Sequence, residues 1–236
     1  MNLSKSTVLD GQLLLIDKPL EWTSFQVVHK LRGVLRKKYQ LKKLKVGHAG
    51  TLDPLATGLL LICTGKATKN ISALQDLEKV YTGTITLGAT TPSFDLETPF
   101  DQKFSIDHIT PQKIELARAQ FVGEIKQHPP VFSAIKKEGK RLYEWARKGT
   151  EITTEARSVT LYDFEITHIS LPHLTFRVRC SKGTYIRSLA NDFGKALDSG
   201  AHLSELRRTA IGTYRVEDAL SPQLWTARLD TISQED

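Results

Sequence analysis

The chain has 236 residues, 40% of them hydrophobic and 25% charged, which is ordinary for a globular protein and excludes a low-complexity chain. Its net charge of +7 favours an acidic partner, and its length allows one large domain or two small ones. No segment is apolar enough to span a membrane or to act as a secretory leader, so we expect no membrane partner and a cytoplasmic protein. Cys63 and Cys180 lie far apart without metal-binding spacing, so we expect two buried thiols and no metal site.

The first predicted elements are a strand and a helix. Residues 13–16 form a short apolar run that ends in Asp17-Lys18-Pro19, which is typical of a buried strand followed by a turn. Thr23 or Ser24 can then cap a helix. The apolar positions at helical spacing in it are Phe25, Val28, Leu31 and Leu35.

A strongly basic interval follows. Between Thr23 and Leu52 the sequence has no acidic residue and eight lysines and arginines. Cations are favoured at the end of a helix, but eight unopposed charges exceed that need, so we expect a surface that faces phosphates. The candidates for contact with a phosphate backbone in this interval are Lys37, Lys38, Lys42 and Lys43.

The glycine-punctuated segment at residues 47–58, GHAGTLDPLATG, holds one histidine and one carboxylate. Glycine allows sharp turns and the close approach of another molecule. Asp53 precedes a proline, which biases its backbone towards an extended conformation. On spacing alone such a loop is more often structural than catalytic. A single acid between basic segments nevertheless suggests chemistry on a polyanion.

Residues 80–87 alternate as in a half-buried strand, with Tyr81 on its apolar face. Thr110-Pro111 predicts the start of a helix that runs to about Phe121.

The segment from residue 127 to 155 then interleaves basic and aromatic residues, which suits a nucleic-acid surface and equally suits an amphipathic hairpin or helix. Its candidates for contact with a nucleic-acid backbone are Lys136, Lys137, Lys140 and Arg141.

Two further strands are predicted at residues 158–169 and 173–181, and Thr184 can cap a helix after Gly183. Because strands and helices do not alternate regularly, we expect an α+β fold with a mixed, largely antiparallel sheet flanked by helices and loops.

Four motifs resemble those of the TruB family of tRNA pseudouridine synthases. The run GHAGTLDPLATGLLLICTGKATK at residues 47–69 resembles the aspartate motif of that family. The other three, in the family's order, are Leu15-Ile16-Asp17-Lys18-Pro19, Lys79-Val80-Tyr81, and CSKGTYIR at residues 180–187. The resemblance implies a pseudouridine synthase fold with a central RNA-binding cleft.

The resemblance also implies roles for individual residues. Asp53 would be the nucleophile, and Arg187 the cation that keeps its carboxylate ionised. Tyr81 would stack on the target uracil and is a candidate for proton abstraction. Tyr185 and Leu206 would line the pocket of the flipped base, and His48 would insert into the RNA loop.

The implied reaction converts uridine 55 of the TΨC loop of tRNA to pseudouridine without a cofactor. The expected partner is the T-arm of tRNA, bound by a monomer that needs no protein partner. We expect a catalytic domain at residues 1–220, whose segment 127–155 is mobile and orders on RNA, and a short tail at 221–236 in place of a PUA-type domain. The alternatives are a non-catalytic RNA-binding or tRNA-folding module and a synthase that acts on another RNA.

Overall fold

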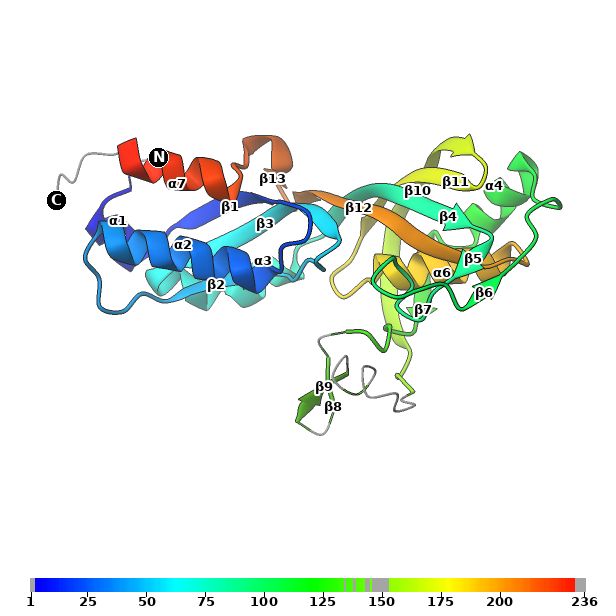
Figure 1. Ribbon diagram of the computed structural model, residues 1–236, viewed down its shortest axis with the longest axis horizontal. Helices are drawn as coiled ribbons and strands as arrows, with labels where there is room; N and C mark the ends of the chain where they lie inside the picture. The colour runs from blue at the N-terminus through cyan, green and yellow to red at the C-terminus, as the bar shows by residue number, and fades with distance from the viewer. Residues whose placement is uncertain (1–2, 134, 138, 143–144, 146–152, 232–236) are drawn as a thin grey trace. The chain divides into compact units, whose positions relative to one another are not determined.

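The computed structural model describes residues 3–133, 135–137, 139–142, 145 and 153–231, and its chain forms two compact units (Figure 1). Unit 1 comprises Met1–Tyr81 and Arg207–Asp236, and unit 2 comprises Thr82–Leu206. The chain passes from one unit to the other within the strands β4 (Lys79–Leu87) and β12 (Ala201–Ile211).

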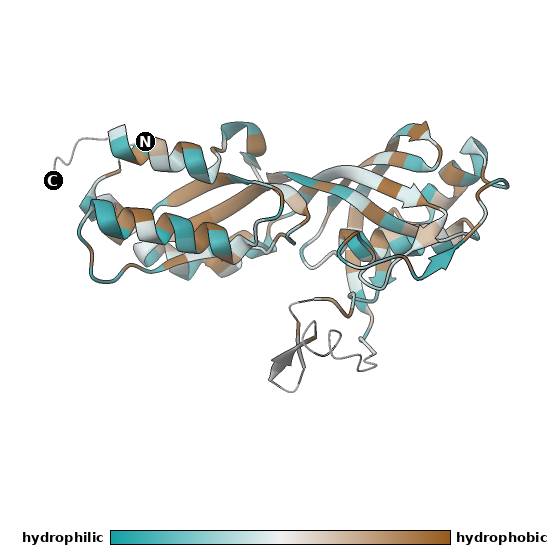
Figure 2. Ribbon diagram, in the orientation of Figure 1, coloured by the Kyte–Doolittle hydropathy of each residue, from teal (hydrophilic) through white to brown (hydrophobic). Residues whose placement is uncertain are grey.

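The centre of unit 1 is β3 (Ala56–Thr64), which pairs antiparallel with both β1 (Leu13–Lys18) and β2 (Val46–Ala49). Its continuous apolar run is typical of a strand that is covered on both faces, and Figure 2 shows this apolar concentration. Leu60 and Ile62 belong to one buried cluster, whereas Leu59 and Leu61 belong to another. The sheet order in this unit is β1-β3-β12, with β13 (Tyr214–Arg215) paired to β12.

The first cluster is covered by α2 (Ser24–Lys38) and α7 (Pro222–Thr231). Of the two candidate caps, Thr23 is the one that caps α2, in a capping box with Gln26. Trp225 of α7 is buried, and its indole donates to the carbonyl of Leu15 over 3.0 Å. The described part of residues 221–236 therefore contributes a helix to the core of unit 1.

One expectation about α2 is wrong. Val28, Leu31 and Leu35 are buried as predicted, but Phe25 is 63% exposed. The helix buries Val27 beside Val28 instead, so the apolar face of the helix that packs against the sheet does not include Phe25.

Unit 2 has the sheet order β12-β4-β11-β10-β7. Its long strand β10 (Arg157–Ser170) pairs antiparallel with β11 (His173–Cys180) and with β7 (Gly123–Gln127). Phe164 and Phe176 of these strands pack edge to face, and Phe193 of α6 (Ile186–Ala196) packs against Phe164. The helix α4 (Pro111–Ala119) begins at the predicted Thr110-Pro111.

The remaining elements are short. They are α1 (Lys5–Asp10), the 3-10 helices η1 (Gly65–Asn70) and η2 (Val216–Asp218), α3 (Ile71–Asp76), and the two-stranded pairs β5 (Ala89–Thr90) with β6 (Gln102–Lys103) and β8 (Lys136–Lys137) with β9 (Lys140–Arg141).

The α+β class and the largely antiparallel sheet are confirmed, and both cysteines are buried as predicted. The predicted cap of α6 is wrong by one residue, because Tyr185 occupies that position and Thr184 donates to the carbonyl of Ser181 instead. Among the described helices, none is both long and apolar enough to cross a membrane.

Candidate active site

Asp53 lies in the loop at residues 50–55, which joins β2 to β3 and which we call the Asp53 loop. Two neighbouring segments of unit 1 fasten this loop. The hydroxyl of Ser24, at the start of α2, accepts from the Leu52 amide at 2.8 Å and donates to the Leu52 carbonyl at 3.1 Å. The amide of Glu21 donates to the carbonyl of Pro54 over 2.9 Å. The half-buried Asp53 is thus held by its neighbours on both sides.

A fully buried lysine lies next to this loop. The ammonium of Lys18 donates to the carbonyls of Trp22 at 2.6 Å, Pro19 at 2.9 Å and Pro54 at 3.3 Å. Burial lowers the pKa of Lys18 from 10.5 to about 8, the charge of Asp53 opposes this shift, and Arg208 adds to it.

A second buried cation, Arg208 of β12, holds the start of the same loop. Its guanidinium donates to the carbonyls of Leu59 at 2.7 Å and Gly50 at 3.1 Å, with a longer contact to Thr51 at 3.5 Å. Arg208 is buried, with 1% of its surface exposed. Gly58 permits this approach, since a Cβ there would lie 2.3 Å from the Arg208 carbonyl oxygen.

His48 of β2 faces the same cation. Burial lowers the pKa of its imidazole below 6.5, and the charge of Arg208 lowers it further, while a hydrogen bond with the Gly50 backbone raises it by less. Its buried Nδ1 has no hydrogen-bond partner within the described part of the chain. His48 is therefore a neutral ring at pH 7, a form suited to stacking on a base rather than to binding a phosphate.

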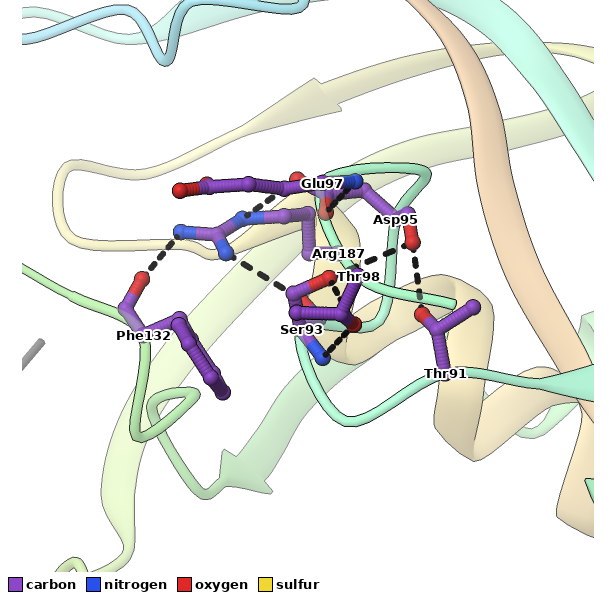
Figure 3. Close-up of polar contacts among 7 residues, drawn as sticks. All are labelled: Thr91, Ser93, Asp95, Glu97, Thr98, Phe132 and Arg187. Carbon is purple, nitrogen blue, oxygen red and sulfur yellow. Dashed lines mark hydrogen bonds and ion pairs between the residues drawn. The ribbon is translucent and has the colours of Figure 1, made fainter. Parts of the chain in front are cut away.

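In unit 2, Arg187 is the second residue of α6 and is 3% exposed. Its guanidinium donates to the carbonyls of Phe132 at 2.9 Å and Ser93 at 3.1 Å, and its Nε lies 3.6 Å from Oδ2 of Asp95 (Figure 3). A cation at a helix N-terminus is unfavourable unless a carboxylate compensates it, and Asp95 supplies that charge.

The loop that carries Asp95 is itself closely bonded (Figure 3). The carbonyl of Asp95 accepts from the hydroxyls of Thr91 at 2.6 Å and Ser93 at 3.2 Å, and its Oδ1 accepts from the Glu97 amide at 2.9 Å. Thr98 accepts from the amide of Ser93 at 3.1 Å. These bonds hold the carboxylate in place before any substrate binds.

The buried Gln127 at the end of β7 replaces the missing side-chain cap of α6. Its Nε2 donates to the carbonyl of Tyr185 at 3.0 Å, and its Oε1 accepts from the Tyr185 amide at 2.7 Å. The hydroxyl of Ser188 donates to the carbonyl of His128 at 2.7 Å. The first residues of the segment 127–155 are therefore bonded to the helix that bears Arg187.

The other residues expected at the site fall in both units. Tyr81 is 8% exposed in β4 of unit 1, Tyr185 is half-buried at the cap of α6, and Leu206 is half-buried in β12 of unit 2. The functional-site residues that the sequence analysis missed are Arg208, Asp95 and Gln127, and Lys18 appeared there only as part of a motif.

The basic candidates divide into three groups. Lys37, Lys42 and Lys43 are exposed. Lys38 is only half-exposed, and its ammonium donates to the Leu229 carbonyl in the last turn of α7, so its contact is structural. The backbones of the remaining four form the β8–β9 hairpin, and their side chains lie outside the described part. They are Lys136, Lys137, Lys140 and Arg141.

Comparison with known proteins places this geometry in a family. Residues 36–186 match the family model of the TruB family pseudouridylate synthase N-terminal domain, and residues 187–227 match that of the tRNA pseudouridylate synthase B C-terminal domain. The chain is 62% identical to the tRNA pseudouridine synthase B of Flavobacterium johnsoniae, over 94% of this chain and 97% of that protein. It is 52% identical to the tRNA pseudouridine synthase B of Phocaeicola vulgatus, over 94% of each.

Among solved structures, a chain of the crystal structure of a Cbf5-Nop10-Gar1 complex superposes with a TM-score of 0.71 at 30% identity. The match covers 98% of this chain and 59% of that one. A second match, at 28% identity and a TM-score of 0.68, is to a structure of an H/ACA RNP bound to a substrate RNA. The two family models and the curated relatives agree with the motifs around Asp53 and Arg187, and together they show that this chain belongs to the TruB family of pseudouridylate synthases.

Proposed function

We propose that this chain isomerises uridine 55 in the TΨC loop of tRNA to pseudouridine, with Asp53 as the reacting carboxylate. Its curated relatives are named tRNA pseudouridine synthase B, which supports tRNA as the substrate class. The observation that carries the chemical part is the Asp53 loop, whose backbone is bonded to the buried cations Lys18 and Arg208.

The reaction breaks the bond between N1 of uracil and C1′ of ribose, turns the base and joins C5 to C1′; C5 loses its proton and N1 gains one, so the product is an isomer of the substrate. Asp53 can act by adding to C6, by attacking C1′, or by assisting a glycal intermediate. All three routes need an ionised carboxylate in a site with little water, because a carboxylate in bulk water is a weak nucleophile. The buried ammonium of Lys18, which donates to the carbonyl of Pro54, would place a positive charge beside this carboxylate.

Arg187 would supply further positive charge to the carboxylate once RNA is bound. Its guanidinium is permanently charged, and Asp95 and two carbonyls fix its plane. Charge that is preorganised in this way costs no reorganisation during the reaction.

The flipped uracil would lie against aromatic and aliphatic side chains. Tyr81 would stack on it with its hydroxyl near the C5 proton, while Tyr185 and Leu206 would form the walls of the pocket. The neutral ring of His48 would occupy the space that the base leaves in the RNA, which offsets part of the cost of unstacking.

The direct test is incubation of the purified protein with unmodified tRNA in buffer with a metal chelator, followed by chemical mapping of pseudouridine. We expect modification at position 55, with no added cofactor or protein. Modification at another position or only in another RNA would reassign the substrate. Binding without product in an otherwise folded protein would favour a tRNA-folding module.

A further inference from the structure

The N-terminal half of α2 carries an exposed aromatic and basic surface in unit 1. A shallow depression of about 350 Å³ is lined by the five residues that we call the α2 platform: Trp22, Phe25, Gln26, His29 and Lys30. The Phe25 ring is 63% exposed, and His29 and Lys30 are exposed beside it. The buried stripe of the helix does not use Phe25.

The α2 platform adjoins the Asp53 loop through printed hydrogen bonds within one unit. Ser24, which lies between Trp22 and Phe25 in the chain, exchanges two hydrogen bonds with the backbone of Leu52. Trp22 itself accepts from the ammonium of Lys18, which also bonds to Pro54. A chain that enters the Asp53 loop would therefore pass within reach of this surface.

The chemistry of the surface fits a single nucleotide. An exposed ring offers a stacking face to any unpaired base, and an adjacent lysine can bind its phosphate. The charge of the helix is complementary to RNA, because no acidic residue occurs between Thr23 and Leu52. Gly33 continues the row of Phe25 and His29 along the helix, and a Cβ there would meet no atom within 4 Å, so the backbone is open to close approach.

We infer that the α2 platform binds an unpaired nucleotide of the substrate RNA that neighbours the target uridine. The base stacks on Phe25 at the rim of the depression, and Lys30 contacts its phosphate. This inference rests on the proposed function, since it concerns RNA that is already positioned at the Asp53 loop. It assigns to α2 a role in substrate affinity that is separate from the chemical step.

The test combines protein variants with abasic substitutions in a T-arm hairpin. Phe25→Ala should weaken hairpin binding about tenfold, within the range for loss of one base–aromatic stack, while Phe25→Tyr keeps the ring and should bind within about twofold of wild type. Leu224→Ala is the matched control, because Leu224 is a similarly exposed apolar residue of unit 1, at 58%, on α7. Leu224→Ala should also keep the rate of pseudouridine formation at saturating enzyme within about threefold of wild type.

The abasic substitutions identify the base. At one unpaired position beside the target, removal of the base should weaken wild-type binding as much as Phe25→Ala does and should weaken the variant no further. Equal binding by Phe25→Ala and wild type, or additive losses at every unpaired position, would overturn the inference. A change of oligomeric state in Phe25→Ala without loss of RNA affinity would overturn it in favour of a second copy on this face. Hairpin affinity and pseudouridine formation are measured separately. If the proposed function fails, wild type forms no pseudouridine, while the differences in hairpin affinity between wild type and the Phe25 variants remain.

Discussion

Asp95 is the carboxylate on which the position of Arg187 depends. Replacing Asp95 by Asn keeps the size but removes a buried carboxylate next to a buried guanidinium, since the side chains of Asp95 and Arg187 are 6% and 3% exposed. We expect a stability loss of about 3 kcal/mol or more, as for other broken buried pairs, and a rate loss of at least about tenfold at saturating enzyme.

The control for Asp95→Asn is Asp163→Asn, which breaks the exposed pair between Asp163 and Arg177, whose side chains are 46% and 42% exposed. An exposed pair contributes about 1 kcal/mol or less, so this variant should keep both stability and rate. Equal rates in wild type and Asp95→Asn would mean that Arg187 does not need this partner for catalysis.

Because of the lowered pKa of Lys18, we expect pH to have opposite effects on the stability of the protein and on its reaction rate. This pKa is about 8 in the folded protein and 10.5 in the unfolded chain. The unfolded chain binds more protons between these values, so the Lys18 contribution to the free energy of unfolding rises as the pH rises through this window. The reaction rate should instead fall above about pH 8, because the charge beside Asp53 is lost.

Single-turnover rates and melting temperatures between about pH 6.5 and 9 measure both effects. Lys18→Met should react slowly and should lose the fall in rate near pH 8, while Lys66→Met, which changes an exposed lysine that pairs with Asp10, should retain it. A wild-type rate that stays level through this range would exclude a role for the Lys18 charge.

The site residues that could be predicted from the sequence are those that lie within a recognisable sequence motif. Asp53 and Arg187 lie in short runs that resemble a known family, whereas Arg208, Asp95 and Gln127 act through contacts with residues far away in the chain. A buried cation that bonds to carbonyls leaves no periodic signal, because its partners are backbone atoms of other elements. These residues became visible only with the fold.

At the scale of elements, the sequence predicted the helices that begin with a clear capping residue and the strands in which apolar and polar residues alternate. The cap of α2 is Thr23, one of the two candidates that the sequence offered, and α4 begins at the predicted Pro111; both starts follow from local side chain–backbone bonds. The exposure of Phe25 was not predicted, because helical spacing defines a face of the helix but does not show which residues at its edge pack against the sheet. The strand β12 was not predicted, since it carries charged residues in its interior and buries Arg208 by tertiary contacts.

The basic end of α2 should bind phosphates through only part of its lysines. Replacing the exposed Lys37, Lys42 and Lys43 together by Gln should weaken binding to all RNA stems and reduce the slope of log affinity against log salt by roughly two to three. Lys38→Gln should instead lower the melting temperature with little change in slope, because its ammonium caps α7 at Leu229. A triple variant with an unchanged slope would show that this cluster does not face the RNA.

At the scale of the whole molecule, recognition should rest on the T-arm. Residues 127, 128 and 132 are bonded to α6 and Arg187, so an RNA stem held by the segment 127–155 would act directly on the helix that bears this arginine. The mobility of that segment stays a prediction, and its residues 134, 138, 143–144 and 146–152 lie outside the part of the chain that the structure describes. An isolated T-arm hairpin should react nearly as fast as full-length tRNA.

Single-turnover rates of the T-arm hairpin and of full-length tRNA, measured at saturating enzyme, test this prediction. A scrambled hairpin of equal length is the control and should give no product. A T-arm rate more than about a hundredfold lower, equivalent to about 2.7 kcal/mol of transition-state binding, would require essential contacts beyond the T-arm.

The central claim is that the carboxylate of Asp53 performs the reaction. It is tested most directly by release of the C5 hydrogen from a tritium-labelled uridine in the T-arm hairpin, measured under single-turnover conditions with Asp53→Asn. This variant keeps the size of the side chain and removes its charge and most of its nucleophilicity. We predict no detectable release, with hairpin affinity within about threefold of wild type. Release within about tenfold of the wild-type rate would remove Asp53 from the mechanism.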